Sequence, residues 1–231
     1  MIFEQLFDLK YSTYTYIISS GKGREALIID PVIDNINQYI KVLENLKLKL
    51  VKVLDTHIHA DHITGMNELN KRTKCVRVMG EHSKSEVIDI KLKDNEKLKI
   101  ENIELKAIYT PGHTDCSYSY LMENKVFTGD TLLINGTGRT DFQSGNPYDA
   151  YDSLFNKLLK LPDKTFVYPA HDYDKKRYST IEKEKNNNPR LQVNSKDEYA
   201  EIMNNLKLPY PKMMEIAVPA NLKGLTLDKF N

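Results

Sequence analysis

Short runs of apolar and β-branched residues, each followed by a turn or a polar loop, dominate the first part of the chain. Residues 14–20 and 26–29 flank a glycine-containing turn and predict a β-hairpin. Ile and Leu then recur at helical spacing from the expected N-cap Asp34 to Lys47, and an apolar run predicts a buried strand at residues 50–54. The order strand, helix, strand indicates sheet pairing with a crossover helix on one face.

The middle of the chain continues this alternation of short elements. From residue 89 to 108, Leu or Ile alternates with Lys, Asn and Glu, the period of strands with one solvated face, so these lysines predict a wet sheet face rather than a binding patch. The other predicted elements are short helices at 66–71 and 81–86, strands at 76–79 and 165–168, a hairpin of 118–122 with 125–127, and an amphipathic helix at 147–161.

The last part of the chain reads as helical. Residues 179–187 and 196–206 predict helices, the first with Ser179 as N-cap and Glu182 at the capping-box position, and the tail has no strand pattern. Two β-rich halves, each closed by helices, predict an α/β (α+β) fold in which two mixed sheets carry helices on both outer faces. We expect residues 1–231 to form one domain with a short helical tail at about 179–231.

Composition narrows the functional classes. The net charge of +1 argues against a dedicated nucleic-acid or polybasic membrane surface, because phosphate binding needs a concentrated positive field. No stretch is long and apolar enough to predict a membrane span. Two cysteines, Cys75 and Cys116, cannot build a disulfide framework, and a reducing intracellular compartment is expected. The N-terminus is acidic and lacks the Arg-rich character of a transit peptide.

The densest chemistry lies in T-H-I-H-A-D-H-I-T-G at residues 56–65, directly after the predicted strand at 50–54. This loop places three imidazoles and a carboxylate within six positions, at His57, His59, Asp61 and His62. Imidazole and carboxylate are common ligands of transition metals. The loop therefore predicts a metal site whose remaining ligands lie elsewhere in the chain.

Three later stretches also end a predicted strand with a ligand-type residue: His113 in P-G-H-T, Asp130 in T-G-D and His171 in P-A-H. Only one of the six histidines, His82, lies outside these positions. A single histidine is usually a packed or solvated imidazole. Five of them at strand ends, together with two carboxylates, predict one metal site at an edge of the sandwich.

The H-x-H-x-D-H loop followed by P-G-H-T, T-G-D and a strand-end histidine resembles the metallo-β-lactamase superfamily, whose fold is an αββα sandwich. Within it the sequence is most similar to the persulfide dioxygenases, the relatives of the human ethylmalonic encephalopathy protein. The supporting stretches, besides residues 56–65, are I-D-P-V at 29–32, G-R-T-D-F-Q-S-G at 138–145, Y-P-A-H-D-Y at 168–173, N-P-R-L at 188–191 and A-V-P-A-N-L at 217–222.

This resemblance implies one Fe(II) per chain, held by the expected catalytic residues His57, His113 and Asp130. Two imidazoles and one carboxylate leave positions open for O₂ and substrate. The implied reaction oxidises glutathione persulfide with O₂ to sulfite and glutathione, in sulfide detoxification. The remaining residues of the cluster would orient ligands and waters through hydrogen bonds: His59, Asp61, His62 and His171.

Glyoxalase II, the nearest relative of that family, offers an alternative function. There a binuclear zinc site hydrolyses hydroxyacylglutathione thioesters, with Asp130 bridging, His59 completing one site, and Asp61, His62 and His171 forming the other. Both ligand sets are present, so ligand inventory leaves one metal and two metals open. The short tail and G-R-T-D-F-Q-S-G favour the dioxygenase. The intact ligand set disfavours a non-catalytic member of the superfamily, and the absence of a basic bias disfavours one that processes nucleic acids. A β-lactamase is disfavoured because the loop carries His62 where those enzymes have other residues.

Arg139 and Tyr173 are the substrate-binding candidates that the resemblance implies. The structural alternatives are a surface salt bridge for Arg139 and a packed aromatic ring for Tyr173. Cys116 stands where the family has glycine, and we expect it to pack rather than to react. Relatives imply a homodimer in the mitochondrial matrix or cytoplasm, with glutathione persulfide and O₂ as partners and neither nucleic acid nor membrane.

Overall fold

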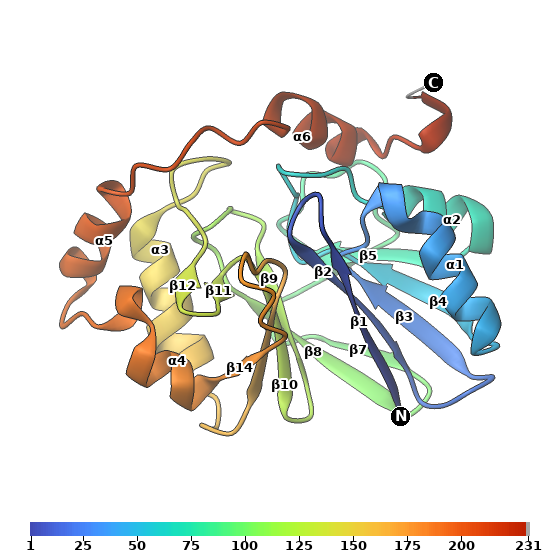
Figure 1. Cartoon of the computed structure of the whole chain (residues 1–231), viewed down its shortest axis with the longest axis horizontal. Coiled ribbons are helices and arrows are strands. Elements are labelled where there is room, and N and C mark those ends of the chain that lie inside the picture. Colours follow the sequence, from blue (N-terminus) through green and yellow to red (C-terminus); the bar gives the residue numbers. More distant parts are fainter. Residues whose placement is uncertain (230–231) are drawn as a thin grey trace.

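Two six-stranded sheets pack face to face in the computed structural model, which describes residues 1–229 (Figure 1). The first sheet has the order β1 (Ile2–Asp8), β2 (Thr13–Ser19), β3 (Glu25–Ile29), β4 (Lys49–Leu54), β5 (Val76–Gly80) and β6 (Ile90–Leu92). The second has the order β14 (Ser179–Thr180), β13 (Phe166–Pro169), β10 (Lys125–Gly129), β9 (Tyr118–Met122), β8 (Ile103–Tyr109) and β7 (Lys97–Ile100). A small ribbon pairs β11 (Leu132–Leu133) with β12 (Gly136–Thr137).

Helices cover both outer faces of this sandwich. The first sheet packs on α1 (Ile36–Asn45) and α2 (Met66–Thr73), and Ala217 and Ala220 of α6 (Met214–Lys223) belong to the same apolar core. The second packs on α3 (Pro147–Tyr151), α4 (Ile181–Asn187) and α5 (Lys196–Asn204). Figure 1 shows α1 and α2 on one side, α3 to α5 on the other, and the chain between α5 and α6 crossing from one side to the other. The predicted αββα sandwich of two mixed sheets is confirmed.

Burial on both faces explains why several strands appear in the sequence as continuous apolar runs. In β2, Tyr16 and Ile18 belong to the core between the two sheets, while Ile17 faces the helices. A strand covered on both sides needs no polar face. In β7, by contrast, Leu98 and Ile100 are buried and the alternating Lys97 and Lys99 are exposed, so the predicted wet face is confirmed there.

Several predicted elements have different boundaries or are absent. The predicted helix at 81–86 is wrong: this segment is a loop, in which Glu81 N–H donates to Leu92 and Glu86 N–H donates to Leu222. Thr180, not Ser179, caps α4, because its side chain accepts from Lys183 N–H. The structure also contains β1, for which the hydrophobic pattern gave no prediction.

The predicted N-cap at Asp34 is wrong as well, because Asp34 lies within a 3₁₀ turn, Ile33–Asn35, ahead of α1. The predicted helix at 147–161 begins at Pro147 as expected but continues after α3 as a π-helical turn, Asp152–Lys157. Within residues 1–229, every helix is too short or too polar to cross a membrane.

Candidate metal centre

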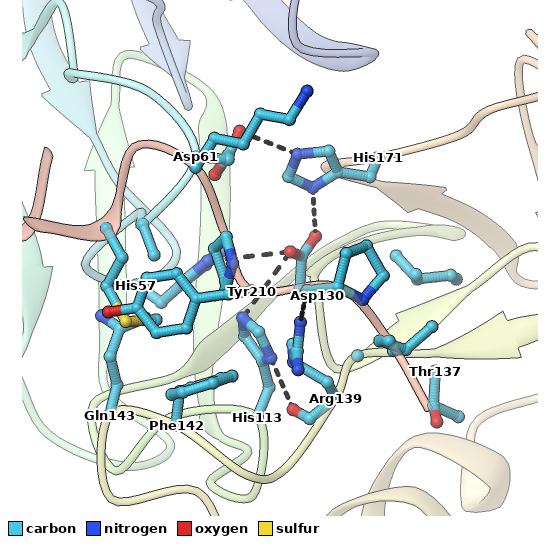
Figure 2. A pocket seen from close by; sticks show the side chains of 18 of the residues that line it. His57, Asp61, His113, Asp130, Thr137, Arg139, Phe142, Gln143, His171 and Tyr210 are labelled. Carbon is cyan, nitrogen blue, oxygen red and sulfur yellow. Dashed lines mark hydrogen bonds and ion pairs between the residues drawn. The ribbon is translucent and has the colours of Figure 1, made fainter. Parts of the chain in front are cut away.

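Four loops at one edge of the sandwich carry the predicted metal-type side chains, and each loop begins where a strand ends. β8, β10 and β13 run in the same direction, so their carboxyl ends deliver His113, Asp130 and His171 to one edge of the second sheet. β4 of the first sheet ends beside them and leads into the loop that holds His57 and His59, whose ring centroids are 4.2 Å apart. In Figure 2 the side chains of His57, His113 and His171 point toward Asp130.

Three of these residues, His57, His113 and Asp130, converge on one point. One ligand-type atom from each lies within 4.8 Å of the other two. Asp130 Oδ2 is 3.9 Å from His57 Nε2 and 3.6 Å from His113 Nε2. These separations are too long for hydrogen bonds. The three atoms therefore surround a point without binding one another.

The remaining ring nitrogens set the tautomers of the two imidazoles. His113 Nδ1 donates to the carbonyl oxygen of Arg139 at 2.8 Å. The Thr56 hydroxyl donates its one proton to Asp30 Oδ2 at 3.0 Å. Its oxygen can therefore only accept from His57 Nδ1, which lies 2.9 Å away. Both rings then carry their lone pair on Nε2, the atom at the convergence point. Burial lowers the pKa of His57 well below its usual value and keeps this ring neutral. Two imidazoles and a carboxylate fit a divalent transition metal.

The second oxygen of Asp130 begins a chain of hydrogen bonds through His171 and Asp61 to His62. His171 Nδ1 donates to Asp130 Oδ1 at 2.6 Å, and its Nε2 donates to Asp61 Oδ2 at 2.9 Å. His62 Nδ1 donates to the same oxygen of Asp61 at 2.8 Å. Burial lowers the pKa of His171, but the two carboxylates outweigh it and raise the pKa well above its usual value. Both ring nitrogens of His171 therefore have a carboxylate partner.

Buried groups support this cluster from behind. His59 Nε2 lies 3.3 Å from Asp30 Oδ1, and Asp30 also accepts from Thr56 N–H at 2.7 Å. Burial lowers the pKa of His59, but the hydrogen bond and charge of Asp30 raise it to about 9. Asp30 has a φ of 51°, a left-handed conformation that costs energy in a non-glycine residue. Within the described chain, His59 Nδ1 and His62 Nε2 are buried atoms without a hydrogen-bond partner.

A cavity of about 470 Å³ opens beside the converging atoms. Residues 208–212, between α5 and α6, form one of its walls, and we call this segment the strap. The Tyr210 ring in the strap packs edge-on against Phe142, with ring centroids 5.3 Å apart (Figure 2). A cavity of this size with an apolar wall and a few polar groups suits a small organic ligand.

Both substrate-binding candidates line this cavity. Arg139 forms an ion pair with Asp141, with Nε and Oδ1 2.6 Å apart, and donates from Nη1 to the Pro209 carbonyl at 2.7 Å, so its side chain also anchors the strap. Tyr173 is 76% exposed and its ring is near-parallel to that of His171. A second guanidinium in the lining, that of Arg190, was not predicted from the sequence. Arg190 lies in N-P-R-L at 188–191, one of the stretches that supported the family resemblance, and this could have drawn attention to it.

Two further motif residues have structural explanations. A Cβ at Gly138 would lie 2.1 Å from the carbonyl oxygen of Asp130, so only glycine fits beside that ligand. Cys116 is buried, its Sγ accepts from Ile58 N–H at 3.4 Å, and burial raises the pKa of its thiol. It lies outside the cavity lining. These contacts fit the packing role predicted for Cys116.

Residues 55–65, which we call the metal loop, are held in place by side chains that were not predicted from the sequence to have this role. Three side chains bind its backbone, those of Asp30, Gln143 and Asn221. The hydroxyl of Thr56 binds the ring of His57. Asp30 and Asn221 lie in stretches that supported the family resemblance, I-D-P-V and A-V-P-A-N-L, so the signal was present without an assigned role.

Comparison with known proteins was made for both sequence and structure. The profile described as Metallo-beta-lactamase superfamily matches residues 10–99 and 80–171. The mouse protein named persulfide dioxygenase ETHE1, mitochondrial, is 38% identical over 226 residues, covering 96% of this chain and 88% of that protein. The crystal structure of ETHE1 from Myxococcus xanthus matches with a TM-score of 0.93 and 44% identity, covering 96% and 98% of the two chains. Hydroxyacylglutathione hydrolase of Dictyostelium discoideum is 36% identical over 187 residues, covering 75% and 68%.

Proposed function

Because this chain belongs to the metallo-β-lactamase superfamily and, within it, to the persulfide dioxygenase family, we propose that it oxidises glutathione persulfide with O₂ to sulfite and glutathione. The proposed catalytic centre is one Fe(II) held by His57, His113 and Asp130. Its role would be sulfide detoxification. The hydrolysis of a glutathione thioester at two zinc ions is the alternative.

The observation that carries a single metal is the engagement of His171. Both of its nitrogens donate to carboxylates, those of Asp130 and Asp61, so neither offers a lone pair to a second ion. His57 Nε2 and His113 Nε2, by contrast, present lone pairs beside an unengaged carboxylate oxygen. Three ligands on one ion leave the open positions that an oxygenase requires.

When bound, the ferrous ion would supply the positions at which persulfide sulfur and O₂ meet and the electrons that activate O₂. The protein supplies the orientation. Thr56 and the Arg139 carbonyl hold the two imidazoles in the required tautomer, and the His171 cation keeps Asp130 ionised against the cost of burial. Phe142 and the strap give the cavity an apolar wall, which restricts the access of bulk water to the reacting sulfur.

Cationic and aromatic side chains around the cavity would bind the glutathione part of the substrate. Glutathione has two carboxylates, and a guanidinium forms paired hydrogen bonds with such a group. We propose Arg139 and Tyr173 as contacts, with Arg190 and Lys212 as further cations in the same lining. Arg190 is already oriented, because it donates to the carbonyl oxygen of Thr137.

One observation favours the binuclear alternative. His59 Nδ1 and His62 Nε2 are buried in the described chain without a hydrogen-bond partner, as expected of nitrogens that bind a metal. A second ion would also need His171 to exchange its hydrogen bond with Asp61 for a metal bond. Hydrolysis of a hydroxyacylglutathione thioester by a metal-bound hydroxide would then be the reaction.

One experiment separates the two functions. The protein is purified anaerobically and loaded with Fe(II), its metal content is counted, and oxygen consumption is followed on addition of glutathione persulfide. Oxygen uptake with sulfite formation at about one iron per chain would support the dioxygenase. The opposite result, no uptake but two zinc ions per chain and hydrolysis of S-lactoylglutathione, would replace it with the hydrolase.

We further propose that the protein forms a homodimer and acts in the mitochondrial matrix or cytoplasm, with neither nucleic acid nor membrane as partner. The net charge of +1 supports the absence of a nucleic-acid partner. Sedimentation analysis of the purified protein and fractionation of the source cells test these two points.

A further inference from the structure

The C-terminal helix α6 contributes a buried amide to the metal loop. Asn221 is 3% exposed. Its Nδ2 donates to the carbonyl oxygens of His59 and His62, at 2.9 and 3.0 Å. Its Oδ1 accepts from Thr64 N–H at 2.9 Å. One side chain thus binds three peptide groups of a loop that lies far away in the sequence.

The loop needs this support because it is buried but irregular. Residues 55–65 join β4 to α2 without helix or strand, so their peptide groups lack the regular partners of secondary structure. Two carbonyls and one N–H of the loop find those partners in a single amide. Only Asn and Gln offer two donors and an acceptor in one uncharged group, and Asn is the shorter of the two.

Helix α6 is itself held in place by contacts outside the metal loop. Ala217 and Ala220 are buried in the core beside the first sheet. Ser85 Oγ donates to the carbonyl of Asn221, and Glu86 N–H donates to the carbonyl of Leu222, at 3.2 and 3.0 Å. The packed helix therefore provides a fixed position from which Asn221 holds the loop.

A displacement of the loop would also move the proposed metal ligands, because hydrogen bonds connect the two. Asn221 binds the peptide groups on both sides of Asp61. Asp61 binds His171, and His171 binds Asp130, whose other oxygen faces the metal position. The loop also holds His57 close to the peptides that Asn221 binds.

We propose that Asn221 is a positioning residue that couples the docking of α6 to metal binding, so that a bound metal tightens α6 and a docked α6 strengthens metal binding. Such coupling is reciprocal by thermodynamic necessity. The proposal rests on the proposed metal site, not on the proposed reaction.

The first test measures metal affinity. Metal-free wild type and the variants Asn221→Ala and Asn221→Asp are titrated anaerobically with Fe(II) against a competing chelator. Asn221→Asp keeps the size and the acceptor but loses both donors to the loop carbonyls. Both variants should bind Fe(II) about 10- to 100-fold more weakly, the range seen when residues that orient metal ligands are changed.

The matched control is Asn188→Ala. Asn188 is also a buried asparagine; its Nδ2 donates to the Gly136 carbonyl and to Glu184, and its Oδ1 accepts from Arg190 N–H. Its loss should destabilise the fold through a similar number of broken hydrogen bonds while leaving the Fe(II) dissociation constant at the wild-type value. Equal weakening by Asn188→Ala and Asn221→Ala would overturn the proposal, because general destabilisation would then explain both.

The second test needs no change at Asn221. Hydrogen exchange of the α6 amides is measured in wild type with and without Fe(II), and in His113→Ala as a protein that cannot complete the site. Fe(II) should slow exchange in α6 of wild type and leave His113→Ala unchanged. Identical α6 exchange with and without bound Fe(II) would overturn the proposal even if the Asn221 variants fail to fold.

The outcomes also separate this proposal from the proposed function. Wild type that binds no Fe(II), or a His113→Ala variant that binds it fully, would disprove the metal site. Wild type that binds Fe(II) but fails to consume O₂ with persulfide would disprove the reaction alone. Coupling between α6 and Fe(II) would stand in that last case.

Discussion

Two groups of imidazoles and carboxylates lie side by side at the edge of the sandwich and differ in what their polar atoms contact. In the first, His57 Nε2, His113 Nε2 and one oxygen of Asp130 converge without bonding to one another. In the second, Asp61 and His171 are bound to neighbouring side chains through short hydrogen bonds. Residue types therefore do not decide how many metals bind; the partners of each nitrogen and oxygen do.

The first group should lose its metal entirely when one ligand is removed. His113→Ala leaves two ligands around the convergence point, so we expect no stoichiometric Fe(II) and oxygen uptake at background level. Metal analysis and an oxygen electrode measure both. His82→Ala is the control, because His82 is a histidine outside the cluster that stacks on Tyr109. Full iron occupancy in His113→Ala would show that the three ligands are wrongly assigned.

The second group should tune the metal rather than hold it. His171→Gln breaks the chain between Asp130 and Asp61, and we expect Fe(II) affinity to fall about 10- to 100-fold with the stoichiometry still at about one. Chelator competition and metal counting give the two numbers. A wild type with two zinc ions and a variant with one would instead place His171 among the ligands of a second ion.

Substrate binding should separate from metal binding at Arg139. Its carbonyl oxygen positions His113, while its side chain faces the cavity and the strap. Arg139→Ala keeps the carbonyl and removes the guanidinium, so iron content should stay unchanged while KM for glutathione persulfide rises about tenfold, as for the loss of one charge-assisted hydrogen bond. An unchanged KM with a lower kcat would assign the side chain to something other than substrate binding.

The metal-free protein should show the state of His171 directly. The carboxylates of Asp130 and Asp61 raise the pKa of His171 well above the value of about 6.5 expected in an unfolded chain. This raised pKa contributes stability that is fully present below about pH 6.5 and is lost as pH rises through the folded pKa. Imidazole NMR signals recorded across a pH titration should show His171 losing its proton at a higher pH than an unfolded-chain histidine. His171→Gln should remove this part of the pH dependence of unfolding. A neutral His171 at pH 7 would free one of its nitrogens and weaken the case for a single metal.

The smallest effect is expected at Cys116. Cys116→Ala removes a buried sulfur that accepts one hydrogen bond from the metal loop. We expect a loss of about 1 kcal/mol in the free energy of unfolding, with iron content and kcat unchanged. Urea denaturation and steady-state rates check this. Loss of kcat at full iron occupancy would make the thiol a participant in the reaction.

The sequence indicated candidate metal-type residues at strand ends, because each follows an apolar run and carries a distinctive side chain. His113, Asp130 and His171 could be recognised on that basis. It could not predict which atoms are engaged, since that depends on groups such as Asp30 that approach only in the folded chain. Helix 81–86 failed because its backbone groups pair with β6 and α6, contacts that local periodicity does not encode. Similarly, α6 contains Pro219, which lowers the helical propensity of this segment, and the helix is stabilised by the packing of its buried residues.

The three converging residues proposed to bind the metal are divided between the two sheets: His57 follows β4, while His113 and Asp130 follow β8 and β10. Neither sheet alone holds all three residues, so a metal that binds all of them requires the two sheets to be docked. Contacts that form after the rate-limiting step slow unfolding and leave the folding rate nearly unchanged. We therefore expect a bound metal to lower the unfolding rate and so lengthen the lifetime of the folded chain, with little effect on the folding rate.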